Sequence, residues 1–375
     1  MKYGDPVVMN FLDSGKLPNC DDSSIDTGLV AWERLSTLLK EGVNAGTTFS
    51  NPIASTYSQL ATGSYVGGVM DTHGTIHFMP YGNFSVLTLS SQGVNGSYTL
   101  LNTQSGGYSG GVLGPNGDIH MAPTAAAVGQ KISASGIVST YSLVYTISLA
   151  YTGGVADSAG SVHFIPQRAL YGQKVSTAGV VSTYSIPITS ASSPVFHGGV
   201  LAPNGDVHFM PYYAGAGMKI SAAGVVSTYS LFLAGSGNYS GGVLDLNGNI
   251  HFVPCVGYVG QKISSAGVVS TYSLVYTTST GAYIGGVLAP NGDIHFIPWK
   301  ATVGQKVSHS GVVSTYSLAY TNLNGAYKGG VIDTNGDIHF VQNGGFSHGI
   351  AQKISTGCEI PFSLGVCCSP FFNKI

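Results

Sequence analysis

The sequence is poor in charged residues. Lysine, arginine, aspartate and glutamate together make up 8% of its 375 residues, and the formal net charge is -2. Ordinary soluble proteins carry about 25% charged residues. Arginine occurs only at Arg34 and Arg168, and glutamate only at Glu33, Glu41 and Glu359. A chain without a basic excess lacks the electrostatic footprint of a nucleic-acid binder, so we expect no nucleic-acid partner.

Long apolar runs and metal-binding cysteine patterns are also missing. No run approaches the roughly 20 apolar residues of a membrane span. Asp5 and Pro6 interrupt the N-terminus, which therefore lacks the apolar core of a secretory signal. The five cysteines are odd in number and have no metal-ligand spacing. We expect reduced thiols, no metal and no cofactor, and a pairing of Cys20 with Cys367 or Cys368 stays open.

What the sequence does have is a repeat. A Gly-Gly-Val tripeptide recurs seven times at spacings of 43, 43, 45, 43, 44 and 44 residues, and starts at Gly67, Gly110, Gly153, Gly198, Gly241, Gly285 and Gly329. A histidine follows ten residues after each first glycine, at His77, His120, His163, His208, His251, His295 and His339. Most copies continue with Gln-Lys and then with Ser-Thr-Tyr-Ser.

The sixth copy shows how one unit folds. Residues 283–288 are a short apolar strand, and Asn291-Gly292 predicts a tight two-residue hairpin because both residues tolerate positive φ. Residues 293–298, 304–308 and 312–320 are three further β-rich runs. Four short strands every ~40–45 residues are typical of a propeller blade. We therefore predict an all-β, seven-bladed β-propeller over residues 47–356.

The two ends of the ring must be joined. An extra copy of the fourth strand, Ser55 to Ser58, precedes the first double glycine, and the last unit has only three clear strands. We favour closure by this N-terminal strand, which removes exposed strand edges. The alternative uses residues 358–364 as the last outer strand, where Pro361 is tolerable only at an edge.

These repeats resemble the seven-bladed repeat propellers of the kelch, WD-repeat and lectin type. The double glycine echoes kelch, whereas no Trp-Asp closes the units as in WD repeats. The runs GGVLAPNGDVHFMP (198–211) and GGVLAPNGDIHFIP (285–298) look like repeats of uncharacterised bacterial, phage and large-virus propellers. This resemblance implies a binding or virion-surface role and carries over no catalytic residue.

Comparison of the seven units predicts which face binds. The turns between first and second strands and between third and fourth strands are nearly uniform, whereas the loops between second and third strands differ in sequence. Varied loops on a rigid scaffold commonly carry recognition. Their candidate ligand- or partner-binding residues are Tyr81, Arg168, Tyr171, Tyr212, Tyr213, Tyr258, Trp299, Lys300, Phe346 and His348.

The repeated residues are interpreted as structural. The seven histidines occur once per blade, too far apart to share a metal, so each is expected to hydrogen-bond a hydroxyl group. The aromatics two residues before each double glycine, such as Tyr283 and Phe196, are expected in the core. In the sixth unit Lys306 should lie opposite His295 and pair with Asp293 across the strands.

The termini differ from the repeat. Residues 26–41 predict one short helix with an apolar face. We interpret residues 1–46 as an N-terminal docking segment and residues 357–375 as a C-terminal tail packed near it. The candidate docking residues are Leu29, Trp32, Leu35, Leu38, Leu39, Phe371 and Phe372.

No enzyme constellation stands out from the repeat, since the aspartates lie one per blade in turns. We therefore expect a non-enzymatic virion structural protein, made in the host cytoplasm and placed on the virion surface. Its role would be capsid decoration, or host attachment as a phage tail-fibre component. Its partners would be other virion or surface-assembly proteins and host glycans. The alternative is a lectin or adhesin that binds carbohydrate outside the cell or at its surface.

Overall fold

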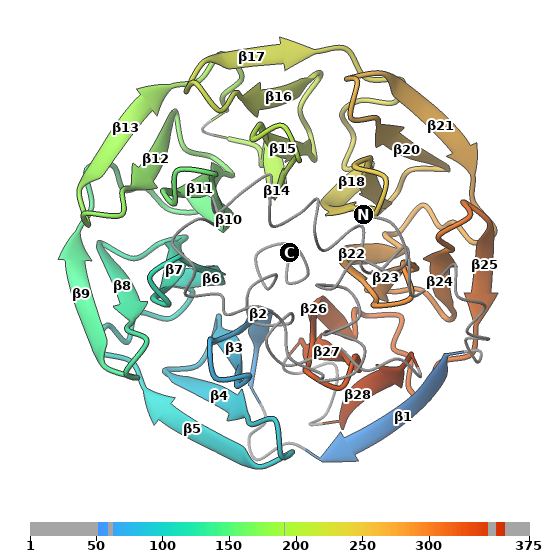
Figure 1. The fold of residues 1–375 in the computed structure, drawn as a ribbon, viewed down its shortest axis with the longest axis horizontal. Helices are drawn as coiled ribbons and strands as arrows, with labels where there is room; N and C mark the ends of the chain where they lie inside the picture. Colours follow the sequence, from blue (N-terminus) through green and yellow to red (C-terminus); the bar gives the residue numbers. More distant parts are fainter. Residues whose placement is uncertain (1–51, 59–62, 191, 344–349, 357–375) are drawn as a thin grey trace, which may run out of the picture.

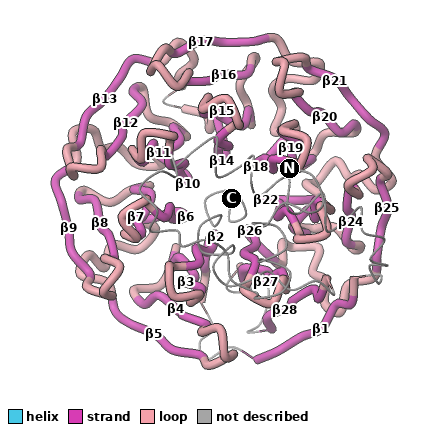
Figure 2. The backbone as a smooth tube through the Cα atoms, in the orientation of Figure 1, coloured by secondary structure: helices cyan, strands magenta, loops and turns pink. Residues whose placement is uncertain are grey.

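The computed structural model describes residues 52–58, 63–190, 192–343 and 350–356, and these residues form a closed ring of β-sheets. The described strands make seven antiparallel four-stranded sheets, arranged like blades around a central axis (Figure 1). Figure 2 shows strands and loops alone among the described residues. None of these residues forms a helix that could cross a membrane. The predicted seven-bladed propeller is confirmed.

The blades follow one another along the chain, and each runs from its inner to its outer strand. Blade 1 comprises β2 (Tyr65–Met70), β3 (Ile76–Pro80), β4 (Ser85–Leu89) and β5 (Asn95–Thr99). Blade 2 comprises β6 (Tyr108–Leu113), β7 (Ile119–Pro123), β8 (Val128–Ile132) and β9 (Val138–Ser142). Blade 3 comprises β10 (Tyr151–Ala156), β11 (Val162–Pro166), β12 (Tyr171–Val175) and β13 (Val181–Ser185). Blade 4 comprises β14 (Phe196–Leu201), β15 (Val207–Pro211), β16 (Gly217–Ile220) and β17 (Val226–Tyr229).

Blade 5 comprises β18 (Tyr239–Leu244), β19 (Ile250–Pro254), β20 (Val259–Ile263) and β21 (Val269–Ser273). Blade 6 comprises β22 (Tyr283–Leu288), β23 (Ile294–Pro298), β24 (Gly304–Val307) and β25 (Val313–Tyr316). Blade 7 comprises β26 (Tyr327–Ile332), β27 (Ile338–Gln342), β28 (Ile350–Ser355) and β1 (Ile53–Ser58). The N-terminal strand β1 is therefore the outer strand of the last blade, and it pairs antiparallel with β28 from Ile53↔Ser355 to Ser58↔Ile350.

The double glycine bends each inner strand. In blade 6 the first glycine, Gly285, has φ of 74°, and the register shifts between Tyr283 and Gly286. Positive φ is readily adopted only by glycine, so this position makes a β-bulge that side chains would oppose. A Cβ on Gly286 would lie 2.7 Å from Val243 of the preceding blade. The second glycine thus lets neighbouring inner strands pack closely around the axis.

The turn between the first two strands differs from the predicted hairpin. In blade 6 the amide of Gly292 donates to the carbonyl of Ala289 at 2.9 Å, and Gly292 has φ of 80°. Asn291 has no positive φ. Blades 5 and 7 make the same turn without a proline, since Gly248 donates to Asp245 and Gly336 donates to Asp333. The turn is thus a type I turn followed by a left-handed glycine, and Pro290 fits its second position.

The interpretations of the repeated histidines, aromatics and lysine are confirmed. Each of the seven histidines makes a hydrogen bond between its Nδ1 and a fourth-strand tyrosine hydroxyl, as in His295–Tyr316 at 3.2 Å. The aromatics before the double glycines are buried in the core, as Tyr283 and Phe196 show. Lys306 lies opposite His295 and binds the Asp293 carboxylate at 2.6 Å.

Two kinds of blade alternate around the ring. In blades 1, 3, 5 and 7 the histidine Nε2 also contacts a carboxylate, in the pairs His77–Asp71, His163–Asp157, His251–Asp245 and His339–Asp333. Blades 2, 4 and 6 have Gly114, Ala202 or Ala289 at that aspartate position. In these blades a lysine pairs instead with the aspartate two residues before the histidine, as in Lys131–Asp118 and Lys219–Asp206.

Several predictions lie outside the described residues. They are the helix at 26–41, the docking residues Leu29, Trp32, Leu35, Leu38, Leu39, Phe371 and Phe372, and the pairing of Cys20 with Cys367 or Cys368. Phe346 and His348 of the candidate binding face also lie there. Cys255 is described, and it is a buried free thiol.

Candidate active site

The inner strands place one side chain each at a single register around the axis. This register falls between the buried aromatic and the double glycine, and its residues are Val66, Ser109, Thr152, His197, Ser240, Ile284 and Lys328. Their neighbours in sequence are nearly constant, whereas these seven differ in charge, polarity and size. Figure 1 shows the strands that carry them, from β2 to β26, facing the centre of the ring.

A cavity of about 120 Å³ lies at the central mouth of the propeller. Six of the seven register residues line it, all except Ser240. Loops between second and third strands complete the wall with Tyr81, Thr124 and Gln167, and a blade-to-blade connection adds Leu149. The cavity therefore opens on the face with the varied loops, where ligand sites of propeller scaffolds are expected.

His197, on β14, is a neutral imidazole in this cavity. Burial, together with the nearby charge of Lys328, lowers its pKa to about 4. Its Nδ1 hydrogen-bonds Ser240 Oγ at 2.5 Å, and its ring lies 5.4 Å from that of Tyr212. Nε2 has no hydrogen-bond partner among the described residues. A neutral imidazole held at one nitrogen and open at the other is arranged as a general base.

Lys328, on β26, is a partly buried ammonium. Its Nζ lies over the rings of Tyr81 and Trp299, at 5.3 and 5.2 Å from their centroids. Burial lowers its pKa. Within the described ranges no carboxylate forms an ion pair with it. The aromatic faces stabilise the cation without neutralising it, so its charge remains available to a ligand.

Hydroxyl groups and a strained backbone complete the wall. Ser109 Oγ and Thr152 Oγ1 are 3.3 Å apart, and Thr124 Oγ1 donates to the carbonyl of Tyr151 at 2.6 Å. Leu149 has φ of 58°, where other blade connections have glycine, for example Gly281 and Gly325. A branched side chain in this left-handed region costs energy, and such strain is often found at functional sites.

The predicted binding face is brought together only in part. Tyr81 and Trp299 flank Lys328, and Tyr212 packs on His197, so these three border the mouth. Arg168 and Lys300 are half-buried, and Tyr171, Tyr213 and Tyr258 are exposed. His197 and Lys328 are not among the residues predicted from the sequence, because they do not belong to the repeated residue types. In the sequence they occupy the one variable position between the aromatic residue and the double glycine of each unit.

No protein-family model matches this chain, and no curated protein matches it. Several solved structures, in contrast, match this chain. Virginiamycin B lyase from Staphylococcus aureus has a TM-score of 0.70 and 15% identity, over 81% of this chain and 99% of that chain. A catalytically inactive variant of that lyase, with one histidine replaced by alanine and with quinupristin, has a TM-score of 0.70 and 16% identity, over the same shares.

A further similar structure is the extracellular domain of a hybrid two component system from B. thetaiotaomicron. It has a TM-score of 0.60 and 11% identity, over 82% of this chain and 42% of that chain. At these identities the likeness shows the fold. None of these similar structures is a phage or viral protein.

These findings correct the sequence-based function. The prediction of a non-enzymatic virion protein, with a lectin as alternative, is wrong, because three of the similar structures, each matched over 97–99% of its own chain, are virginiamycin B or streptogramin B lyases. The exclusion of catalysis is wrong for the same reason. It rested on the absence of paired acids and arginines, whereas a histidine and a lysine meet at the mouth. Among the described residues, no three His, Cys, Asp or Glu side chains gather to hold a metal.

Proposed function

We propose that this protein is an enzyme of the lyase type, with its active site at the central mouth. The observation that carries the proposal is the pairing of a neutral His197 with an uncompensated Lys328 in one cavity. The names of the similar lyases support this class of reaction, as does the inactivity of a histidine variant of one of them.

The chemistry assigned to the two residues is an elimination. Nε2 of His197 takes a proton from a carbon next to a carbonyl group, and the electrons of that C–H bond form a C=C bond. The bond to a leaving oxygen on the adjacent carbon breaks, and this oxygen departs as an anion. The Lys328 ammonium stabilises the negative charge that develops on the carbonyl oxygen. The cavity of about 120 Å³ admits the reacting group rather than the whole of a large substrate.

Turnover assays with two variants test this proposal. The chain is incubated with quinupristin and with a panel of β-acyloxy carbonyl compounds, and the products are analysed by absorbance and mass. Elimination that opens a ring gives a conjugated double bond at unchanged mass, whereas hydrolysis adds one water. We expect His197→Gln to lower the rate by about 100-fold or more, as loss of a general base does. Lys328→Met should lower the rate by at least about tenfold.

His73→Gln is the matched control, since His73 is a histidine with a side chain 69% exposed, away from the lining of the mouth. Its rate should equal that of the unmodified chain. Turnover that survives both His197→Gln and Lys328→Met would contradict the proposed site. Products that carry an added water would contradict elimination and indicate hydrolysis instead.

A further inference from the structure

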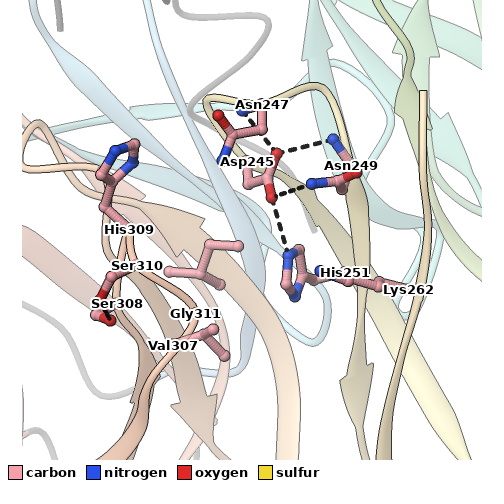
Figure 3. A pocket seen from close by; sticks show the side chains of 12 residues that line it. Asp245, Asn247, Asn249, His251, Lys262, Val307, Ser308, His309, Ser310 and Gly311 are labelled. Carbon is pink, nitrogen blue, oxygen red and sulfur yellow. Dashed lines mark hydrogen bonds and ion pairs between the residues drawn. The ribbon is translucent and has the colours of Figure 1, made fainter. Parts of the chain in front are cut away.

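A second cleft lies on the opposite face, between blades 5 and 6. Its volume is about 120 Å³. One wall is the turn between β18 and β19 with His251 and Lys262, and the other is the turn between β24 and β25, which carries His309 (Figure 3). These turns belong to the uniform face, so this cleft is separate from the central mouth.

Lys262, like Lys174 of blade 3, lacks the carboxylate that four of its counterparts bind. The equivalent lysines form ion pairs in four blades, namely Lys131–Asp118, Lys219–Asp206, Lys306–Asp293 and Lys353–Asp337. Lys262 occupies the same register, opposite His251, but Asn249 stands at the aspartate position. In the described part of the chain Lys262 forms no ion pair. The ammonium of Lys262 therefore lines the cleft without a carboxylate in direct contact among the described residues.

The nearest carboxylate is already occupied. Asp245 accepts hydrogen bonds from the Asn249 side chain at 2.7 Å and from His251 Nε2 at 3.1 Å. It also accepts the backbone amides of Asn247 and Asn249, both at 2.8 Å. Figure 3 shows these bonds gathered on one side of the cleft. Because Asp245 is used by these donors, it does not replace the aspartate that Lys262 has lost.

The facing wall carries a second exception to the repeat. His309 lies where other blades have Ala134, Thr177, Ala222 and Ser265. Its backbone amide donates to Asp293, but its imidazole has no hydrogen-bond partner within the described residues. Lys262, which has no aspartate at its usual partner position, and His309 thus lie on opposite walls of one cleft and both line it.

We propose that this cleft binds a small oxyanion, a phosphate or carboxylate group, between Lys262 and His309. The ammonium supplies the charge that the missing aspartate would have neutralised, and the imidazole donates from the other side. The proposal is independent of catalysis at the mouth, because none of its residues lines that cavity.

Calorimetric titration of the full chain with inorganic phosphate tests this site, with acetate as a second arm and chloride at matched ionic strength as the blank. We expect saturable phosphate binding that Lys262→Gln weakens at least tenfold, as loss of a charged hydrogen bond does. Lys174→Gln is the matched control. Lys174 has the same register in blade 3, also without an aspartate at the usual position, and the following blade has Ala222 where blade 6 has His309. This variant should bind phosphate as the unmodified chain does.

A second measurement needs no variant. The imidazole signals of His309, followed by NMR in the unmodified chain, should move with phosphate concentration and reach a plateau at the calorimetric affinity. Binding of both anions would indicate a carboxylate-sized site, and binding of phosphate alone a phosphate site. Equal weakening by Lys262→Gln and Lys174→Gln would overturn the proposal in favour of general surface charge. No saturable binding of either anion at tens of millimolar would overturn it as well.

Discussion

The repeated histidines share one hydrogen bond and differ in a second. All seven contact a tyrosine hydroxyl, but only those of blades 1, 3, 5 and 7 also contact an aspartate. In blades 2, 4 and 6 burial lowers the pKa of His120, His208 and His295 to about 4. At neutral pH these three imidazoles are uncharged in the folded protein.

This difference predicts a loss of stability in mild acid. In the unfolded chain these histidines take up protons near pH 6.5, whereas in the folded protein they do so only near pH 4. The unfolded state therefore binds more protons between these values, and stability falls as the pH decreases from about 6.5 to 4. Each histidine contributes up to about 3 kcal/mol to this loss. Denaturant unfolding at several pH values measures the slope.

Two variants separate the histidine from its neighbour. His295→Gln should reduce the slope by the share of one histidine. Tyr316→Phe removes the hydroxyl partner of His295 but keeps the imidazole, so it should lower stability at every pH and leave the slope in place. A free energy of unfolding that stays constant from pH 6.5 to 4 would contradict the neutral, buried state of these histidines.

Residue roles could be predicted from the sequence where a residue type repeats. The hydroxyl partners of the histidines and the Lys306–Asp293 pair follow from strand register, which the alternation of residues sets. His197 and Lys328 could not be assigned in the same way. Their chemistry depends on seven inner strands converging on one cavity, and the spacing within a single repeat does not show that convergence.

At the scale of elements, a buried glutamine joins successive blades. Gln305 on β24 accepts hydrogen bonds from the backbone amides of Val275 at 3.0 Å and Tyr276 at 2.7 Å. These amides belong to the segment that leaves β21 of the preceding blade. The glutamines that act in this way are Gln130, Gln173, Gln261, Gln305 and Gln352. The repeated Gln-Lys dipeptide thus fixes the connection between blades as well as the strand itself.

Gln305→Leu should destabilise the protein by about 1–3 kcal/mol, since it leaves two backbone amides without their acceptor. Blade 4 provides the matched control, because the buried Met218 occupies the glutamine register there. Met218→Leu conserves volume and should cost less than about 1.5 kcal/mol. The midpoint of denaturant unfolding reports both changes. An unchanged midpoint for Gln305→Leu would show that the inter-blade bonds contribute nothing to stability.

The elements themselves were predictable, and their turns less so. Runs of alternating, β-rich residues predicted the strands, because side-chain alternation is a property of the local chain. The Asn-Gly pair predicted a two-residue turn, whereas the chain forms a longer turn in which only the glycine has positive φ. Blades 5 and 7 make the same turn at Asn247-Gly248 and Asn335-Gly336 without a proline, so the Asn-Gly pair alone does not fix the length of the turn.

At the scale of the whole molecule, two kinds of blade alternate around a ring with an odd number of blades. The two kinds of blade alternate from blade 1 to blade 7, so blades 7 and 1, both of the His–Asp kind, meet at the closure. Blade 7 also has the lysine pair, Lys353–Asp337, which makes it the one blade described here with both arrangements. Both pairs lie within blade 7, so they stabilise the blade that β1 completes.

Closure depends on β1, which lies beside β28 at the end of the ring (Figure 1). Six register pairs join the two strands, and Tyr57 of β1 supplies the hydroxyl partner of His339 at 2.8 Å. A chain that begins at Gln59 lacks β1, so β28 presents an unpaired edge and His339 loses its hydroxyl. We expect such a chain to unfold at a temperature lower by more than about 5 °C.

The same edge should change the behaviour of the truncated chain in solution. Unpaired backbone groups on β28 can recruit a strand from another molecule, so sedimentation should show self-association that rises with concentration. A chain that begins at Pro52 keeps β1 and is the control, with which the chain that begins at Gln59 is compared. If the chains that begin at Pro52 and Gln59 melt at the same temperature and remain equally monomeric, the ring is held by its blade-to-blade packing alone. The pairing of β1 with β28 would then be a consequence of closure and not its cause.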